Sequence, residues 1–342
     1  VDAILGTTSY EAVGEAIKEV MHGETPEVFE SIDAPVSKTT DRLVTTGGHY
    51  AFLKIPEGCD KRCTSCIIPY LRGKYRSVPM EQLVKEAEEL AEKGVKELIL
   101  VAQETTLYGK DLYGEKKLPE LLRRLAAVSG IQWIRVLYCY PEEITDELID
   151  VLAEGGKIVP YLDMPIQHAS DRILKKMGRR TNRKELEETV RKLRERVPGI
   201  CLRTTLITGF PGETEEDHRE LLDFVRDMRF DRLGVYTYSR EEGTPAAKFD
   251  QQVHPSTKKR RQKELMLTQQ EIAFRNEEAQ TGRELDVLIE GRLADELTGN
   301  GYVYVGRTYM DAPDVDSNIF VETARDLMSG TFVRVRVTGS QD

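Results

Sequence analysis

Three cysteines, Cys59, Cys63 and Cys66, stand within eight residues of one another in a C-x3-C-x2-C spacing. They follow an apolar run, residues 50–55, that reads as a strand, and the turn-forming residues 56–58 end it. The thiols are therefore predicted to lie on a loop at the carboxyl end of a strand. Barrel-like α/β folds place their chemistry at that end.

Soft thiolates at this spacing favour a metal, and several kinds of site could use them. Zinc usually takes four ligands, but the chain has five cysteines and no second close pair. A disulfide would pair two of the three thiols and leave the third unpaired. A cubane iron–sulfur cluster normally takes four cysteines, so three would leave one iron for a ligand that is not protein. Cluster, zinc and chance spacing all stay open on these grounds.

The chain has 342 residues, a formal net charge of −10 and 39% hydrophobic residues. Its length predicts two domains, or a large domain with a small one. The acidic balance argues against a protein that binds duplex nucleic acid. No apolar run of about eighteen residues occurs, so we expect no membrane span. Few cysteines together with a thiolate cluster indicate the reducing cytoplasm, and we expect a monomer.

Residues 1–48 are predicted to be the tail of an N-terminal domain followed by a linker. A helical pattern runs from about Tyr10 to Val20, and the polar stretch 22–48 is rich in Thr, Pro and Gly. The chain starts at Val1 and not at Met, so we expect a fragment of a longer protein.

Residues 49–280 repeat a strand followed by helix six times. Such alternation predicts a parallel sheet with right-handed crossovers. Six units do not close an eight-stranded barrel, so the expected α/β fold is an open (β/α)6 partial TIM barrel. The predicted strands are 50–55, 98–102, 133–138, 161–166, 201–207 and 233–238.

Polar residues and glycines follow several of these strands and should gather at one mouth. Gln103 and Gln167 follow the second and fourth strands, and Gly209 and Gly212 follow the fifth. All four are candidate cofactor-binding residues. The glutamines are polar residues at strand ends, and the glycines let backbone amides approach a ligand closely. A plain turn into the next helix also explains the two glycines.

Other polar residues have two interpretations each. His168 is either an acid–base group or a hydrogen-bonded structural histidine. The basic loop 72–76 either meets a ligand or is solvated, and 258–261 is most simply a solvated helix face. Cys139 and Cys201 are predicted to be buried and inert.

Residues 281–342 change to short alternating strands, which predict a small antiparallel β-barrel. They hold six Arg and no Lys against eleven Asp plus Glu. Lys and Arg dominate nucleic-acid affinity, so a basic protein is the expected partner. Asp311, Asp314 and Asp316 lie in a turn-prone stretch and are candidate docking residues. The alternative is a solvated acidic loop.

The cysteine spacing resembles that of the radical S-adenosylmethionine (SAM) superfamily, whose free iron binds the amino and carboxylate groups of SAM. Segments 59–76, 163–170 and 209–214 resemble its methylthiotransferases, and the terminal β-module is similar to a TRAM domain. Residues 138–141, the pair Gln167 and His168, and residues 312–316 resemble the branch that acts on ribosomal protein S-twelve.

This resemblance implies an enzyme that methylthiolates the β-carbon of an aspartate in S-twelve, alone or within the small ribosomal subunit. It implies a [4Fe-4S] cluster with an open iron on Cys59, Cys63 and Cys66, together with SAM. A second [4Fe-4S] cluster is expected only in an N-terminal domain that this chain lacks. The expected electron donor is flavodoxin-like or ferredoxin-like. A tRNA methylthiotransferase acting on a modified adenosine and a non-catalytic electron-transfer module remain alternatives.

Overall fold

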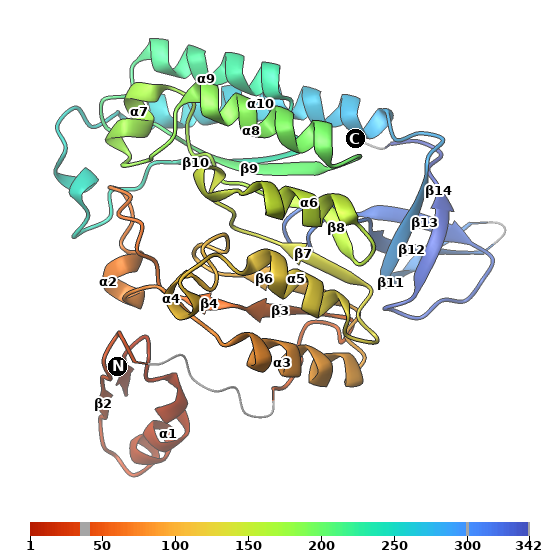
Figure 1. Cartoon of the computed structure of the whole chain (residues 1–342), viewed down its shortest axis with the longest axis horizontal. Coiled ribbons are helices and arrows are strands. Elements are labelled where there is room, and N and C mark those ends of the chain that lie inside the picture. Colours follow the sequence, from red (N-terminus) through yellow and green to blue (C-terminus); the bar gives the residue numbers. More distant parts are fainter. Residues whose placement is uncertain (35–41, 299–300, 341–342) are drawn as a thin grey trace.

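The computed structural model describes residues 1–34, 42–298 and 301–340, and for 294–298 it describes the backbone alone. These residues form an N-terminal unit, a parallel sheet covered by helices, and a C-terminal antiparallel sheet (Figure 1). No helix in the described ranges is long and apolar enough to cross a bilayer.

The N-terminal unit contains one helix and one strand pair. Helix α1 (Val13–Met21) confirms the helix predicted there. Strand β1 (Ile4–Leu5) pairs in parallel with β2 (Glu27–Val28). Strand β2 therefore corrects the prediction that all of 22–48 is linker, and residues 35–41 of that stretch lie outside the described residues.

The central sheet has six strands in the order β10-β9-β8-β7-β6-β3, and all neighbours are parallel. Each unit adds its strand beside the previous one, and β3 and β10 are left as edges. This confirms the open six-unit partial barrel. The strands are β3 (Tyr50–Lys54), β6 (Glu97–Val101), β7 (Trp133–Val136), β8 (Ile158–Asp163), β9 (Cys201–Thr208) and β10 (Arg232–Thr237).

Helices cover the outer face of this sheet (Figure 1). Ile134 and Val136 of β7 point into the core beneath them, because alternate strand residues face the same side. Helix α9 begins with a capping box, in which Thr214 and Asp217 cap each other. The longer helices are α3 (Met80–Glu92), α5 (Leu118–Ala126), α6 (Asp146–Glu154), α8 (Arg183–Arg196), α9 (Glu215–Met228) and α10 (Pro255–Glu278).

The short helix η1 (Tyr10–Ala12) precedes α1 within the helical pattern predicted for the N-terminal unit. Other short elements, which were not predicted from the sequence, lie around the ends of the central strands. They are β4 (Pro56–Glu57), α2 (Ile68–Arg72), β5 (Arg76–Ser77), α4 (Lys110–Tyr113), η2 (Pro141–Glu143) and η3 (Pro245–Lys248). The short α7 (Asp171–Lys176) follows β8.

The C-terminal unit is a curled four-stranded antiparallel sheet in the order β13-β12-β11-β14. It packs on the inner face of the parallel sheet, the face turned away from the helices. Leu288 and Ala312 join a second core there with Ile99 and Trp133. The strands are β11 (Glu284–Thr298), β12 (Gly301–Arg307), β13 (Ile319–Thr323) and β14 (Phe332–Arg336).

Buried charges tie this C-terminal sheet to the inner face. Glu97 and Arg135 are fully buried, and the Arg135 Nε donates to Glu97 at 2.8 Å. The Arg307 guanidinium of β12 donates to the other oxygen of Glu97 at 2.7 Å. Because both oxygens of Glu97 are paired, the cost of burying its charge is largely offset.

Candidate functional site

The cysteine loop lies between β4 and α2, at the carboxyl end of β3. Cys59 is buried, Cys63 and Cys66 are half-buried, and all three are free thiols. Cys139, after β7, and Cys201, in β9, are fully buried, as predicted. The three spaced cysteines are therefore the ones that lie together on the loop at the mouth of the sheet.

The loop takes its shape from backbone contacts around Gly58 and Cys59. The Cys59 amide donates to the Gly73 carbonyl at 3.2 Å. Gly58 adopts a φ of 77°, and a Cβ at that position would overlap the Lys74 carbonyl oxygen. Only glycine fits immediately before the first cysteine.

Thr64 anchors the middle of the loop to two other segments. Its amide donates to the Met177 carbonyl at 2.9 Å, and its hydroxyl donates to the Lys176 carbonyl at 2.8 Å. Its carbonyl accepts from the Ala246 amide at 2.9 Å. These contacts fix the loop against α7 and η3 and so present the thiols in one arrangement.

Burial controls the protonation of two of these thiols. It raises the pKa of Cys59 to about 12, and the nearby Glu104 carboxylate and the other thiols add to that rise. Burial also raises the pKa of Cys66. Both thiols are therefore protonated at neutral pH, and binding a metal group must release their protons. A bound metal ion stabilises the deprotonated thiolate. A ligand that suits these thiols therefore contains metal ions.

The arrangement of the sulfurs distinguishes a cluster from a single metal ion. Within the described ranges, no three Cys, His, Asp or Glu side chains converge where one metal ion could bind. A mononuclear zinc site needs its ligands to converge on one ion. In a cubane each cysteine binds a different iron, so its ligands need not converge. Three cysteines fit a [4Fe-4S] cluster with one iron lacking a protein ligand.

Two of the predicted binding residues, Gln103 after β6 and Gln167 after β8, lie beside this loop's end of the sheet. The side-chain oxygen of each is buried and has no hydrogen-bond partner among the described residues. Gln167 also has a φ of 72°, which is uncommon outside glycine. Buried acceptors without partners at this edge indicate a ligand that donates hydrogen bonds.

Glu104 also lies at this end of the sheet, although its sequence position did not distinguish it from the neighbouring polar residues. It is fully buried, and its Oε1 accepts from the amide and the hydroxyl of Thr106. Its Oε2 is buried and has no partner in the described chain. Burial raises the pKa of Glu104 to about 7. An acidic residue directly after a buried strand was the available signal.

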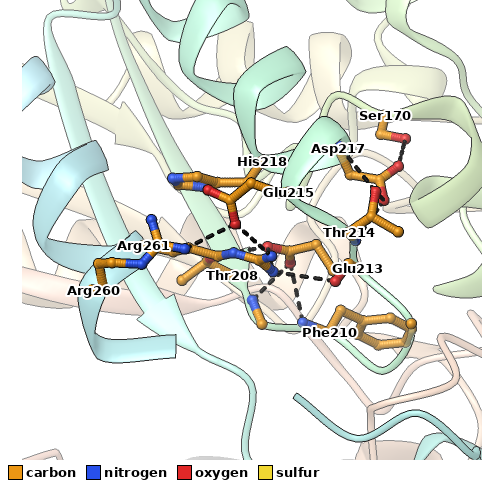
Figure 2. A network of polar contacts seen from close by, with 12 residues as sticks. Ser170, Thr208, Phe210, Glu213, Thr214, Glu215, Asp217, His218, Arg260 and Arg261 are labelled. Carbon is orange, nitrogen blue, oxygen red and sulfur yellow. Dashed lines mark hydrogen bonds and ion pairs between the residues drawn. The ribbon is translucent and has the colours of Figure 1, made fainter. Parts of the chain in front are cut away.

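Glu213 occupies the loop after β9, where Gly209 and Gly212 were predicted to offer amides to a ligand. Its Oε2 accepts from the Gly209 amide at 2.6 Å and from the Phe210 amide at 3.1 Å (Figure 2). The Gly212 amide donates to the Gln251 carbonyl at 2.9 Å. All three amides are engaged within the protein, so their predicted role finds no support in this arrangement.

Arg261 of α10 belongs to the same network. It is 4% exposed and donates to Glu213 Oε1 at 2.8 Å (Figure 2). This corrects the prediction that 258–261 is only a solvated face. His168 is fully buried, and its Nδ1 faces the Ser170 amide at 2.9 Å. Its Nε2 lies 3.7 Å from Glu213, so the histidine supports the loop from inside.

The cations of loop 72–76 pair with carboxylates of the chain itself. Arg72 lies 3.7 Å from Glu57, and Arg76 lies 3.8 Å from Asp33 of the N-terminal unit. Both distances are long for ion pairs. The loop therefore joins the N-terminal unit to the cysteine segment, in addition to the two roles predicted for it.

The three carboxylates predicted to dock a partner differ in burial. Asp311 is 4% exposed and accepts from Arg232 at 2.7 Å. The Asp316 side chain is 3% exposed and accepts from the Tyr161 hydroxyl at 2.7 Å. Docking through these two does not fit their burial, because both hold the C-terminal unit on the inner face. Asp314 is exposed, accepts a hydrogen bond from the Tyr50 hydroxyl at 3.1 Å, and stays a candidate.

Tyr140, after β7, is a further neighbour of the cysteines that the sequence analysis did not select. Its hydroxyl oxygen lies 3.5 Å from the Cys63 Sγ. Burial raises the pKa of Tyr140 well above its ordinary value, so the hydroxyl keeps its proton. The sequence around Tyr140 gave no indication of this contact with Cys63.

Comparison with known families agrees with this geometry. The radical SAM superfamily matches residues 53–225, which include the cysteine loop and the strands through β9. The TRAM domain family matches residues 281–342, the C-terminal sheet. A solved structure of the radical SAM methyltransferase TsrM from Kitasatospora setae, with cobalamin and a [4Fe-4S] cluster bound, has a TM-score of 0.52 and 18% identity. It covers 71% of this chain and 54% of TsrM, and it shows the shared fold.

Curated relatives are much more similar in sequence. "Ribosomal protein uS12 methylthiotransferase RimO" of Lachnoclostridium phytofermentans is 61% identical over 342 residues, which are 100% of this chain and 77% of that protein. The protein of the same name from Acetivibrio thermocellus is 48% identical over 350 residues, covering 100% of this chain and 76% of the relative. The chain therefore belongs to the radical SAM superfamily and, within it, to the family of the uS12 methylthiotransferases named RimO.

Proposed function

We propose that this protein methylthiolates the β-carbon of an aspartate in ribosomal protein uS12. The observation that carries the proposal is the cysteine loop, which presents three thiols at the same end of the sheet as buried acceptors that have no partner among the described residues. The 61% identity to a protein named for this activity supports the substrate. Membership of the radical SAM superfamily implies a [4Fe-4S] cluster and SAM.

Cys59, Cys63 and Cys66 would hold the cluster, and its open iron would take SAM. When bound, the two groups supply one-electron chemistry that removes a hydrogen atom from an unactivated carbon. The Oε2 of Glu104, which has no partner among the described residues, suits the N–H donors of the SAM amino group, since a buried carboxylate oxygen needs a hydrogen-bond donor. The free amide oxygens of Gln103 and Gln167 suit the hydrogen-bond donors of the same ligand.

Further properties belong to the same proposal. A second [4Fe-4S] cluster would serve sulfur delivery, and a flavodoxin-like or ferredoxin-like protein would supply electrons. The protein would act as a monomer in the cytoplasm, on uS12 alone or within the small subunit. Asp314 would contribute to docking uS12, because it is the exposed member of the acidic segment and ribosomal proteins are generally basic.

The test begins with anaerobic reconstitution with iron and sulfide, followed by dithionite and SAM. We expect 5′-deoxyadenosine from the wild type and none from Cys63→Ala, because two thiolates do not retain a cubane. Cys201→Ala, a buried cysteine outside the loop, is the matched control and should keep the activity. Full SAM cleavage by Cys63→Ala would show that the cluster assignment is wrong.

The substrate is tested by intact mass of uS12 after anaerobic incubation with SAM, dithionite, a sulfide source and a reconstituted protein that includes the second-cluster domain. A mass gain of one sulfur and one methyl group, located on an aspartate, is expected. Modification of tRNA in place of uS12 under the same conditions would refute the substrate and favour the RNA-modifying alternative.

A further inference from the structure

The surroundings of Tyr140 contain more than the contact with Cys63. The Lys61 Nζ lies 5.1 Å from the centre of the tyrosine ring, and the Arg179 guanidinium lies 4.2 Å from it. The Arg179 side chain is 2% exposed and is fixed by a hydrogen bond to the Pro165 carbonyl at 3.2 Å. The ring is therefore held in place by two cations as well as by its own packing.

These contacts define the direction of the hydrogen bond. A tyrosine hydroxyl is neutral at pH 7 and has one proton to donate. Cys63 must be a thiolate when it ligates iron, so its sulfur can only accept. Cations over an aromatic ring draw on its π electrons, and this makes the hydroxyl of Tyr140 a stronger donor.

We propose that Tyr140 is a positioning residue that raises the reduction potential of the cluster by donating a hydrogen bond to the Cys63 sulfur. The proposal rests on the proposed function, because it needs a cluster on Cys59, Cys63 and Cys66. Hydrogen bonds to ligand sulfurs and nearby positive charge are established means of setting cluster potentials. A donor to the sulfur stabilises the reduced cluster, which carries one more negative charge than the oxidised one.

The experiment is a redox titration of the reconstituted holoenzyme, followed by electron paramagnetic resonance without SAM. Tyr140→Phe removes one hydroxyl and keeps the ring beneath the two cations, so its midpoint potential should shift to more negative values. Tyr108→Phe is the matched control, since its buried hydroxyl donates to the Val78 carbonyl at 2.8 Å. Its potential should equal that of the wild type. An unchanged or more positive potential in Tyr140→Phe overturns the proposal.

Iron and sulfide content separates this proposal from the proposed function. A wild-type protein that loads no cluster contradicts both, whereas a loaded and SAM-cleaving protein with an unshifted Tyr140→Phe potential contradicts only the role of Tyr140. If Tyr140→Phe retains no cluster, resonance Raman spectra of the wild type in H2O and D2O decide. A deuterium shift of an iron–thiolate stretching band supports the hydrogen bond, and identical bands refute it.

Discussion

Replacement of Glu104 by glutamine should stabilise the protein and weaken its binding of SAM. Burial raises the pKa of Glu104 from an ordinary 4.5 to about 7, although hydrogen bonds from Thr106 and the charge of Lys61 act against the rise. Glutamine has nearly the same shape as protonated glutamic acid. Both side chains are neutral, and both carry hydrogen-bond donors. Glu104→Gln therefore removes the costly charged form and little else.

The sign of the effect follows from the linkage of protonation to folding. The folded protein keeps the Glu104 proton to higher pH than the unfolded chain, so its contribution to stability is full below about pH 4.5 and is lost as the pH rises through about 7. At about 1.36 kcal/mol per pKa unit, the rise corresponds to about 3 kcal/mol. The stability advantage of Glu104→Gln should grow from about 1 kcal/mol at pH 5 to about 3 kcal/mol at pH 8.

The measurement is urea unfolding of the cluster-free protein across this pH range. Glu88→Gln on the exposed side of α3 is the control, and surface changes of this kind stay within about 0.5 kcal/mol. An advantage of Glu104→Gln that does not depend on pH would refute the buried-charge argument. The same variant, reconstituted, should bind SAM more weakly. Unchanged SAM affinity in a stabilised variant would show that Glu104 does not contact the amino group of SAM.

Three other changes test separate parts of the structure. Arg307→Met should lower the free energy of unfolding by about 3–5 kcal/mol, because it leaves buried carboxylates without one of their partners. In the same urea assay, Arg334→Met at an exposed position should lower it by less than about 1 kcal/mol. Equal losses would contradict the difference in burial. Gly58→Ala should fold with a displaced cysteine loop and retain little iron and sulfide on analysis, and normal loading would contradict the backbone clash. Asp314→Asn should weaken binding of uS12 at low salt in titration calorimetry without changing stability, whereas Asp311→Asn should lower stability; unaltered affinity in Asp314→Asn would remove it from the docking surface.

The sequence was sufficient for the features that depend on local spacing. Strand β6 is buried on both faces of the parallel sheet, so its sequence is the continuous apolar run 98–102. The cysteine loop was predictable for a similar reason, since its three thiols lie within eight residues. The capping box at Thr214 is likewise a pattern of four adjacent residues.

The interpretations that failed concern charges paired over long distances in the chain. Asp311 pairs with Arg232 across 79 residues, and Asp316 pairs with Tyr161 across 155. A turn-prone acidic segment has the composition of a solvated loop, and its burial depends on where the C-terminal sheet packs. Arg261 was misread in the same way, because a run of cations on a helix gives no sign of the buried carboxylate that it meets.

The distribution of satisfied and unsatisfied polar groups supports the location of the site. Four buried amide or carboxyl oxygens lack a hydrogen-bond partner among the described residues, and three of them belong to Gln103, Glu104 and Gln167. These three follow β6 and β8, at the end of the sheet that carries the cysteine loop. Under the C-terminal sheet, by contrast, Glu97 has a partner for each of its oxygens. Unpaired buried acceptors are costly without a ligand, so their grouping at the cysteine end of the sheet supports the proposed binding of SAM there.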